Sequence, residues 1–350
     1  MTRGWKRTAP SEPTGSTPVA TAATEGGTVQ VSFGSRTAQQ VLPQVLADLV
    51  RDMGQKAWPY IAKRRDIIRE IESALVDLAT VHQLWLGDSR EVLKRLSDES
   101  VHLVVTSPPY WTLKPYQERE GQLGVIQDYD RFLDELDKVW RECFRLLVPG
   151  GRLVIVVGDV CLPRRRHHRH VVFPLHASIQ ERCRKLGFDN LSPIIWYKIA
   201  NAQFEARGNS GRFLGKPYEP NAVIKNDIEF ILFQRKPGGY RSPGIAERAL
   251  SVIPEDCHRE WFRQVWTLNG ASTREHPAPF PLPLAERLVR MFSFVGDVVL
   301  DPFMGTGTTN VAAARWGRHS IGVEVDPTFF ALARTRLQRA RHSQIEMVGL

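Results

Sequence analysis

The stretch VVLDPFMGTGTT, residues 298–309, joins a short apolar run to a turn that holds two glycines. A pattern typical of an amphipathic helix follows at 308–316. A glycine-bearing turn between a strand and a helix lets the backbone approach a bound nucleoside closely. This stretch therefore predicts one strand-turn-helix unit of an α/β sheet, with a cofactor at the turn.

The next apolar run, 320–323, ends at Glu324, which follows Gly305 by 19 residues. An acidic side chain at the end of the second strand accepts hydrogen bonds from ribose hydroxyls, and the usual spacing is about 20 residues. The third glycine of a dinucleotide fingerprint is replaced by Asn310, and no Gly-Lys-Thr/Ser sequence of a phosphate loop is present. The pattern favours a nucleoside cofactor, and a purely structural turn is the alternative.

Outward from these motifs, short apolar runs alternate with helical patterns from about residue 82. This alternation predicts an α/β fold with a Rossmann-like, mostly parallel sheet and helices on both faces. The expected strands lie at 83–86, 101–105, 153–157, 194–197, 228–233, 298–300 and 320–323, and the expected helices at 129–147, 174–186, 282–294, 308–316 and 327–341.

Composition divides the rest of the chain into segments. Residues 1–36 are rich in Pro, Thr, Ser, Gly and Ala, so we expect a disordered tail that buries too little apolar surface to offset chain entropy. Apolar residues at helical spacing over 37–80 predict a two-helix appendage. Residues 81–350 then form the α/β domain, with a loop-rich insertion at about 199–265.

A second loop, TSPPY at residues 106–110, follows the apolar run 101–105. Consecutive prolines remove two backbone donors and fix φ, so the loop is stiff and its carbonyls point in set directions. A hydroxyl and a rigid carbonyl aimed at one point suit an amino group, which has two N–H bonds to donate. The tyrosine offers a flat face to a base. The alternative is a proline turn that ends a strand.

Together the two loops resemble the hallmarks of the amino-methyltransferases of DNA. That family carries Asp/Asn/Ser-Pro-Pro-Tyr/Phe/Trp and a cofactor motif of the Phe-x-Gly-x-Gly type, matched here at 107–110 and 303–307. The order of catalytic motif, recognition region and cofactor motif resembles the family's β arrangement. The resemblance covers about 82–341 and implies a Rossmann-like methyltransferase sheet with an inserted target-recognition region, and S-adenosylmethionine as the cofactor.

The resemblance also implies roles for individual residues. Ser107 Oγ and the Pro108 carbonyl would accept hydrogen bonds from the target amine, in a loop stiffened by Pro109. Tyr110 would stack on a base extruded from the duplex. The residues expected to hold S-adenosylmethionine are Asp301, Phe303, Gly305, Thr306, Gly307 and Glu324 around the glycine turn, Asp88 at the end of an earlier strand, and His276 in a segment that closes over the methionine end.

The resemblance also narrows the choice of the atom that receives the methyl group. Methylation of a ring carbon of cytosine needs a cysteine that follows a proline in the family that performs it, and none of the four cysteines here does. Serine before Pro-Pro is commoner among enzymes that modify N4 of cytosine, while Asp or Asn favours N6 of adenine. We therefore expect N4 of cytosine as the target, with N6 of adenine as the alternative.

Charge is concentrated in one internal stretch. The chain carries a formal net charge of +9, and residues 160–240 alone hold 14 Lys+Arg against 6 Asp+Glu. Such a surface favours phosphate binding and double-stranded DNA as the partner; a solvated basic face is the alternative. The candidate DNA-binding residues are Arg164, Arg165, Arg166, Arg169, Arg207, Arg212 and Lys216. Cys161 and three nearby histidines could suggest zinc, but neighbouring arginines and irregular spacing favour no metal.

The predicted function is site-specific methylation of DNA in a restriction-modification or epigenetic role, with a cognate restriction endonuclease as a candidate partner. An RNA or small-molecule methyltransferase and a catalytically inactive DNA-binding regulator are the alternatives. No apolar run of about 18 residues and no signal-peptide pattern occur, and the four cysteines are scattered, so we expect a cytoplasmic protein with reduced thiols and no membrane partner. The oligomeric state is left open.

Overall fold

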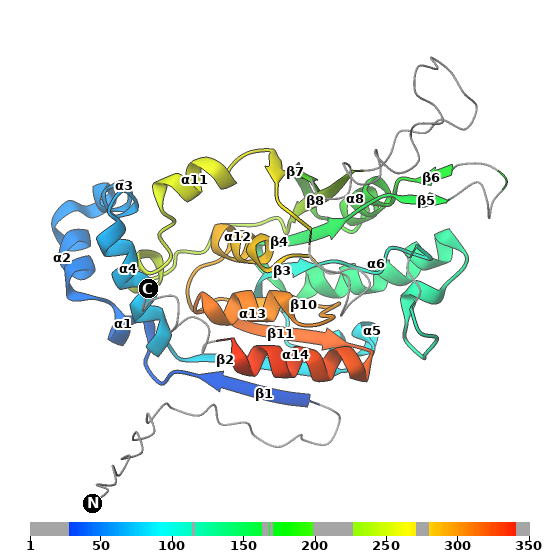
Figure 1. Cartoon of the computed structure of the whole chain (residues 1–350), viewed down its shortest axis with the longest axis horizontal. Helices are drawn as coiled ribbons and strands as arrows, with labels where there is room; N and C mark the ends of the chain where they lie inside the picture. The colour runs from blue at the N-terminus through cyan, green and yellow to red at the C-terminus, as the bar shows by residue number, and fades with distance from the viewer. Residues whose placement is uncertain are drawn as a thin grey trace, which may run out of the picture.

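A nine-stranded sheet between two layers of helices forms the body of the protein (Figure 1). The computed structural model describes residues 28–113, 116–162, 168, 171–198, 227–270 and 280–340. The strand order along the sheet is β1-β2-β11-β10-β3-β4-β8-β7-β9.

Five adjacent strands at the centre run parallel, which confirms the predicted Rossmann-like, mostly parallel sheet. In spatial order they are β2 (Thr80–Leu86), β11 (His319–Glu324), β10 (Val298–Asp301), β3 (Val101–Thr106) and β4 (Leu147–Val157). Because parallel strands all end on the same side, their carboxyl ends form one edge of the sheet, where ligands bind in folds of this class.

The flanking strands make the sheet mixed. β1 (Thr28–Phe33) is antiparallel to β2 at one side, and β8 (Ile228–Arg235) is antiparallel to β4 at the other. β7 (Asp189–Tyr197) pairs antiparallel with β8, and β9 (Val265–Thr267) parallel with β7. β5 (Val160–Leu162) and β6 (Val171–Phe173) form a separate two-stranded ribbon after β4.

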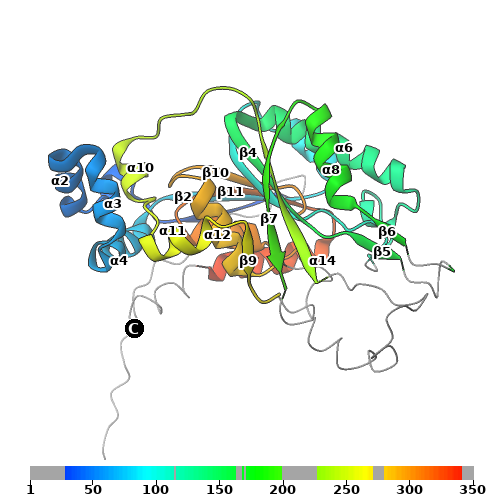
Figure 2. The same cartoon turned by 90° about the horizontal axis from the view of Figure 1, so that it is seen from above.

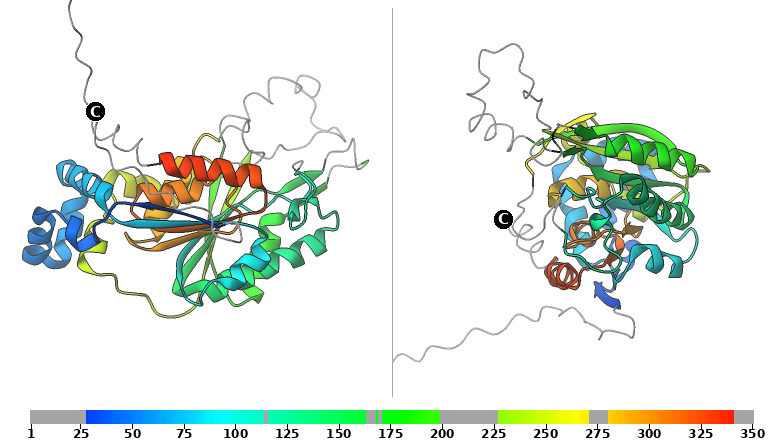
Figure 3. Two further views of the ribbon diagram at one scale, coloured as in Figure 1. Left: turned by 90° about the horizontal axis from the view of Figure 1, so that it is seen from below. Right: turned by 90° about the vertical axis from the view of Figure 1, so that its right-hand side faces the viewer.

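Helices cover both faces of the sheet (Figures 2 and 3). One face carries α5 (Ser89–Val92), α6 (Tyr129–Leu146) and α8 (Leu175–Lys185), and the other carries α12 (Leu282–Phe292), α13 (Thr308–Arg315) and α14 (Pro327–Arg339). α6 begins where Asp128 caps the amide of Arg131, and it buries one apolar stripe. α13 is buried on almost every side, because its small Ala and Thr side chains let it pack tightly beneath the glycine turn.

The segment after β1 is helical and lies against the amino ends of the parallel strands, at the left of Figure 1. It contains α1 (Ala38–Val41), α2 (Gln44–Met53), α3 (Ala57–Ala62) and α4 (Arg65–Ala74), four short helices where the sequence predicted two. Their apolar faces share a core with α10 (Ile245–Ala249), which is followed by α11 (Glu255–Trp261).

Two expectations about segment boundaries are wrong. Disorder was expected over 1–36, but residues 28–33 form β1. Val29, Val31 and Phe33 of this strand are buried, a period-two pattern that the Ser- and Gly-rich composition concealed. The insertion expected at 199–265 contains β8, which is hydrogen-bonded to β4 within the main sheet. No helix in the described ranges is long and apolar enough to cross a membrane.

Candidate active site

The two loops singled out in the sequence meet in one pocket at the carboxyl ends of β2, β11, β10 and β3, here called the carboxyl-edge pocket. They meet because β3 and β10 are neighbours in the sheet. The predicted site residues that line this pocket are Asp88, Ser107, Pro109, Phe303, Gly305 and Glu324. The TSPPY loop and the glycine turn therefore face the same space.

Asp301 fastens the two loops together from beneath. Its Oδ1 accepts hydrogen bonds from Thr106 Oγ1 at 2.7 Å and from the Phe303 amide at 3.0 Å. The side chain is buried, and burial raises the pKa of Asp301 to about 6. Asp301 does not line the pocket, so its contacts suit positioning of the glycine turn better than direct contact with a cofactor.

The glycine turn adopts a conformation that few other residues tolerate. Gly305 has φ +53° and Gly307 has φ +78°, both in the left-handed region, and Gly307 precedes the first turn of α13. Thr306 is buried between them, and its carbonyl accepts a hydrogen bond from Arg336 Nη1 of α14 at 2.7 Å. The turn is therefore held by its own backbone and by α14, and it presents main-chain atoms to the pocket.

Glu324 closes the pocket at the end of β11. Its Oε2 accepts the Gly305 amide at 2.7 Å and its Oε1 accepts the Asp326 amide at 2.8 Å. Burial raises the pKa of Glu324 to about 7, despite these two hydrogen bonds to the carboxylate. Each carboxylate oxygen can accept a further hydrogen bond, so a buried acceptor at this position fits the ribose hydroxyls of a nucleoside.

Asp88 lies at the start of α5, where its Oδ1 accepts the Arg90 amide at 2.9 Å. The guanidinium of Arg90 also pairs with this carboxylate and with Glu135 of α6. Asp88 therefore faces the pocket as a fixed, charge-compensated group at the end of β2.

Tyr110 connects the TSPPY loop to the sheet. Ser107 Oγ lies 3.4 Å from Tyr110 Oη, which in turn donates to Glu229 Oε2 at 3.0 Å, and Glu229 pairs with Lys198. Tyr110 is buried, and burial together with the Glu229 carboxylate raises the pKa of its hydroxyl. Pro108 is buried beside it.

Glu229, Lys198 and Tyr116 belong to the site, and sequence reasoning did not find them. A glutamate inside the apolar run of β8 was an available signal, because a charge there needs a partner. Tyr116 lines the carboxyl-edge pocket, where burial and the nearby Glu324 raise the pKa of its hydroxyl. It had no distinguishing pattern in the sequence.

A second polar group stands just beyond β4. Asp159 Oδ1 lies 2.6 Å from His176 Nδ1, and the His176 ring stacks on Phe230 with centroids 3.8 Å apart. Phe230 follows Glu229 on β8, so the two side chains point to opposite faces of the sheet and this group is distinct from the Tyr110 anchor. A histidine held by a carboxylate on one nitrogen presents its other nitrogen in a fixed direction.

The remaining predicted residues lie outside the described part of the chain. They are His276 and the seven candidate DNA-binding residues Arg164, Arg165, Arg166, Arg169, Arg207, Arg212 and Lys216. Their roles stay predictions. Within the described residues, no group of three or more His, Cys, Asp or Glu side chains could hold a metal ion.

A family model and sequence relatives of this chain indicate the same family of proteins. A family model described as DNA methylase, of the N6/N4 type, matches residues 101–335. The type II methyltransferase M.MjaI of Methanocaldococcus jannaschii is 36% identical over 282 residues, which span 72% of this chain and 89% of that protein.

Two solved structures are similar to this one. A protein of Thermus thermophilus assigned as a DNA modification methylase, in complex with S-adenosyl-L-methionine, is 58% identical, with a TM-score of 0.62 over 74% of this chain and 94% of that one. The cytosine-N4-specific PvuII DNA methyltransferase shares the fold at 20% identity, with a TM-score of 0.54 over 76% of this chain and 91% of that one.

Proposed function

Because the chain belongs to the N6/N4 DNA methylase family, whose members modify an exocyclic amine, we propose that it methylates N4 of cytosine at a specific site in duplex DNA. The protein is an S-adenosylmethionine-dependent DNA methyltransferase. The observation that carries the proposal is that Ser107 and Pro109 open on the same pocket as Gly305 and Glu324. This shared pocket supports a role of the TSPPY loop in holding the acceptor and of the glycine turn in holding the nucleoside.

The residues around the glycine turn fit the cofactor. S-adenosylmethionine, when bound, supplies a methyl group on a positively charged sulfur. Glu324 would accept hydrogen bonds from the ribose hydroxyls, and Phe303 and Asp88 would border the adenosine. Asp301 would keep the turn in register with the TSPPY loop through Thr106.

The TSPPY loop would position the base. We infer that Ser107 Oγ and the Pro108 carbonyl accept the two N–H bonds of the target amine, which directs the nitrogen lone pair into the pocket. Tyr110, anchored by Glu229, would stack on the base once it has left the duplex. Rate enhancement by such a site comes mainly from holding two reactants in line rather than from a strong base.

The preference for cytosine rests on Ser107. A serine hydroxyl stands where an Asp or Asn stands in the family members that favour adenine. We further propose that the modification protects a recognition site from a cognate endonuclease, because several relatives are named type II methyltransferases. The basic stretch between residues 160 and 240 would contact the DNA backbone.

The proposal is tested by expressing the protein in a bacterial host that lacks DNA methylation and sequencing its DNA at single-molecule level. The control is Ser107→Ala, shown to be soluble and to bind S-adenosylmethionine. We expect 4-methylcytosine at one short motif with the wild type and none with the variant. 6-Methyladenine at such a motif would keep the family and overturn the choice of base. Unmodified DNA from a soluble, cofactor-binding wild type would overturn the proposal as a whole.

A further inference from the structure

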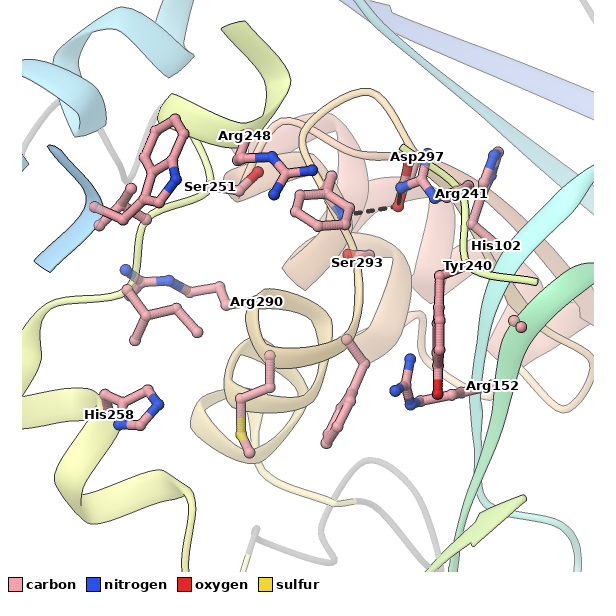
Figure 4. Close-up of a pocket in the computed structure, with 18 of the residues that line it drawn as sticks. His102, Arg152, Tyr240, Arg241, Arg248, Ser251, His258, Arg290, Ser293 and Asp297 are labelled. Carbon is pink, nitrogen blue, oxygen red and sulfur yellow. Dashed lines mark hydrogen bonds and ion pairs between the residues drawn. The ribbon is translucent and has the colours of Figure 1, made fainter. Parts of the chain in front are cut away.

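A second and larger pocket lies at the opposite edge of the sheet, here called the amino-edge pocket. Its volume is about 880 Å³, within the usual range for sites that bind small organic molecules. The start of β4 and the residues before β10 form one side, and α3 and the segment around α10 form the other (Figure 4). From Arg152 in this pocket, β4 runs five residues, about 17 Å, to Val157 near the carboxyl-edge pocket.

Two arginines without an acidic partner enter this pocket. Figure 4 shows Arg152 approaching from β4 and Arg248 from the α10 side. Among the described residues, neither guanidinium forms a side-chain hydrogen bond or ion pair; their recorded contacts are with the rings of Phe292 and Phe294. Asp297, an acid of the pocket wall, is already paired with Arg241. The pocket therefore keeps an excess of positive charge.

Arg152 gives the stronger indication of an anionic ligand. It lies partly buried at the start of β4, and burial lowers the pKa of its guanidinium. A partly buried cation without a counter-charge costs free energy unless a ligand supplies one. The guanidinium group matches the oxygens of a phosphate or carboxylate, to which it can donate two parallel hydrogen bonds.

The rest of the lining suits a flat ring. Trp58, Tyr240, Phe292 and Phe294 all border the pocket, and Tyr240 is 73% exposed although it is aromatic. Exposed aromatic side chains beside a cavity commonly stack on ligands. His102 adds a donor, because its Nδ1 accepts the Val298 amide at 3.1 Å, which leaves the proton on Nε2.

We propose that the amino-edge pocket binds a phosphorylated nucleoside, with its phosphate on Arg152, its ring against Tyr240 and the neighbouring aromatic side chains, and Arg248 at the opposite wall as a donor to a polar atom of the ring. This site is separate from the cofactor site, since the two pockets lie at opposite ends of the parallel strands. DNA engaged at the TSPPY loop would lie at the other edge of the sheet. The site is therefore one for a free nucleotide, and it does not depend on the identity of the methylated base.

The test is isothermal titration of guanosine 5′-monophosphate into protein that has been saturated with S-adenosylmethionine, so that the cofactor site is filled. We expect one saturable site, with guanosine and inorganic phosphate each binding at least about tenfold more weakly. Equal affinity for inorganic phosphate alone would overturn the nucleotide assignment. So would an absence of saturable binding at millimolar nucleotide, or complete displacement of the nucleotide by a short DNA duplex.

Matched variants locate the site. Arg152→Gln and Arg248→Gln should each weaken nucleotide binding by about 10- to 100-fold, as expected for a lost hydrogen bond to a charged group. Arg131→Gln, which removes an exposed arginine of α6, should leave it unchanged. Affinity for S-adenosylmethionine shows whether each variant is folded. If Arg152→Gln lowers this affinity, the test relies on Arg248→Gln, because Arg248 lies on the short helix α10 outside the sheet. Nucleotide binding that is unchanged in Arg248→Gln would overturn the proposal.

Discussion

The hydroxyl of Tyr110 donates a hydrogen bond to Glu229 Oε2 at 3.0 Å and so ties the TSPPY loop to β8. The other oxygen of Glu229 pairs with Lys198, which compensates the charge that a partly buried glutamate would otherwise carry alone. The tyrosine is thus held in place before any base arrives, and the entropy of ordering its ring is already lost in the free protein.

Removing this hydrogen bond should slow catalysis modestly, and removing the ring should slow it severely. We expect Tyr110→Phe to lower kcat by about 2- to 10-fold, because the hydrogen bond to Glu229 is present before and after the base binds, so its loss only loosens the placement of the ring. Tyr110→Ala, which also removes the ring proposed to stack on the base, should lower kcat by about 100-fold or more. Single-turnover methylation of a cognate duplex measures both. Equal losses in the two variants would mean that the hydroxyl, rather than the ring, carries the effect.

Ser107→Ala should separate acceptor binding from cofactor binding. Ser107 lines the carboxyl-edge pocket, and loss of its hydroxyl should reduce turnover on the order of 100-fold because the amine would lose one of the groups proposed to orient it. Affinity for S-adenosylmethionine, measured by calorimetry, should change by less than about twofold, since Glu324 and the glycine turn remain. A parallel loss of cofactor affinity would show that Ser107 contacts the cofactor.

Cofactor affinity should depend on pH through Glu324. In the cofactor-free protein the pKa of this carboxyl is about 7, above its ordinary value of 4.5. In the proposed complex, ribose hydroxyls would donate to the ionised carboxylate of Glu324 and the sulfonium carries a positive charge, so binding would favour the charged form of Glu324. Affinity should therefore fall by up to about tenfold per pH unit as the pH drops below about 7, and level off above it.

Glu324→Gln is the control for this pH dependence. The variant should bind S-adenosylmethionine more weakly at about pH 8 and show little further change down to about pH 6. Asp301, whose pKa burial raises to about 6, is the other buried carboxyl near the turn. A pH dependence that persists in Glu324→Gln would assign the titration to Asp301 instead.

Substitution of two glycines with left-handed backbone should distinguish the free-energy cost of backbone strain from that of a packing clash. At Gly307 a methyl group would lie 3.0 Å from Ala333 Cβ, whereas at Gly296, with φ +82°, it would meet nothing within 4 Å. Gly296→Ala should cost about 1–2 kcal/mol of unfolding free energy from backbone strain alone. Gly307→Ala should cost about 1–3 kcal/mol more, because α14 must move, and it should also weaken cofactor binding. Urea unfolding measures the free energy of unfolding of both variants, provided that the dependence on urea concentration has the same slope in each. Equal losses of unfolding free energy in the two variants would contradict the prediction.

Much of the fold follows from local pattern. The helix expected at 282–294 is α12, which ends at Phe292, and the one expected at 129–147 is α6, which ends at Leu146. Periodicity and turn chemistry act over short distances, so these features can be read locally. The family resemblance indicated that the two loops act together, but their meeting in one pocket depends on β3 and β10 being neighbours in the sheet, which only the structure shows.

What could not be predicted depends on pairs of residues far apart in the chain. Tyr110 and Glu229 are 119 residues apart, and no local pattern announces that one anchors the other. The position of Asp301 beneath the turn likewise follows from its contact with Thr106. The amino-edge pocket exists because the N-terminal helices pack beside the start of β4, an arrangement that the helical spacing of 37–80 does not specify.

The bond between Thr106 and Asp301 spans 195 residues of sequence, and this separation dictates when the enzyme becomes competent. During synthesis β3 leaves the ribosome long before its partner β10 and the glycine turn, which come much later in the chain. Contacts so distant in sequence form late, because the entropy cost of closing a long loop comes before the contacts stabilise the fold. A nascent or prematurely ended chain would carry the TSPPY loop but no complete site. Activity therefore requires that synthesis has passed β10 and the glycine turn.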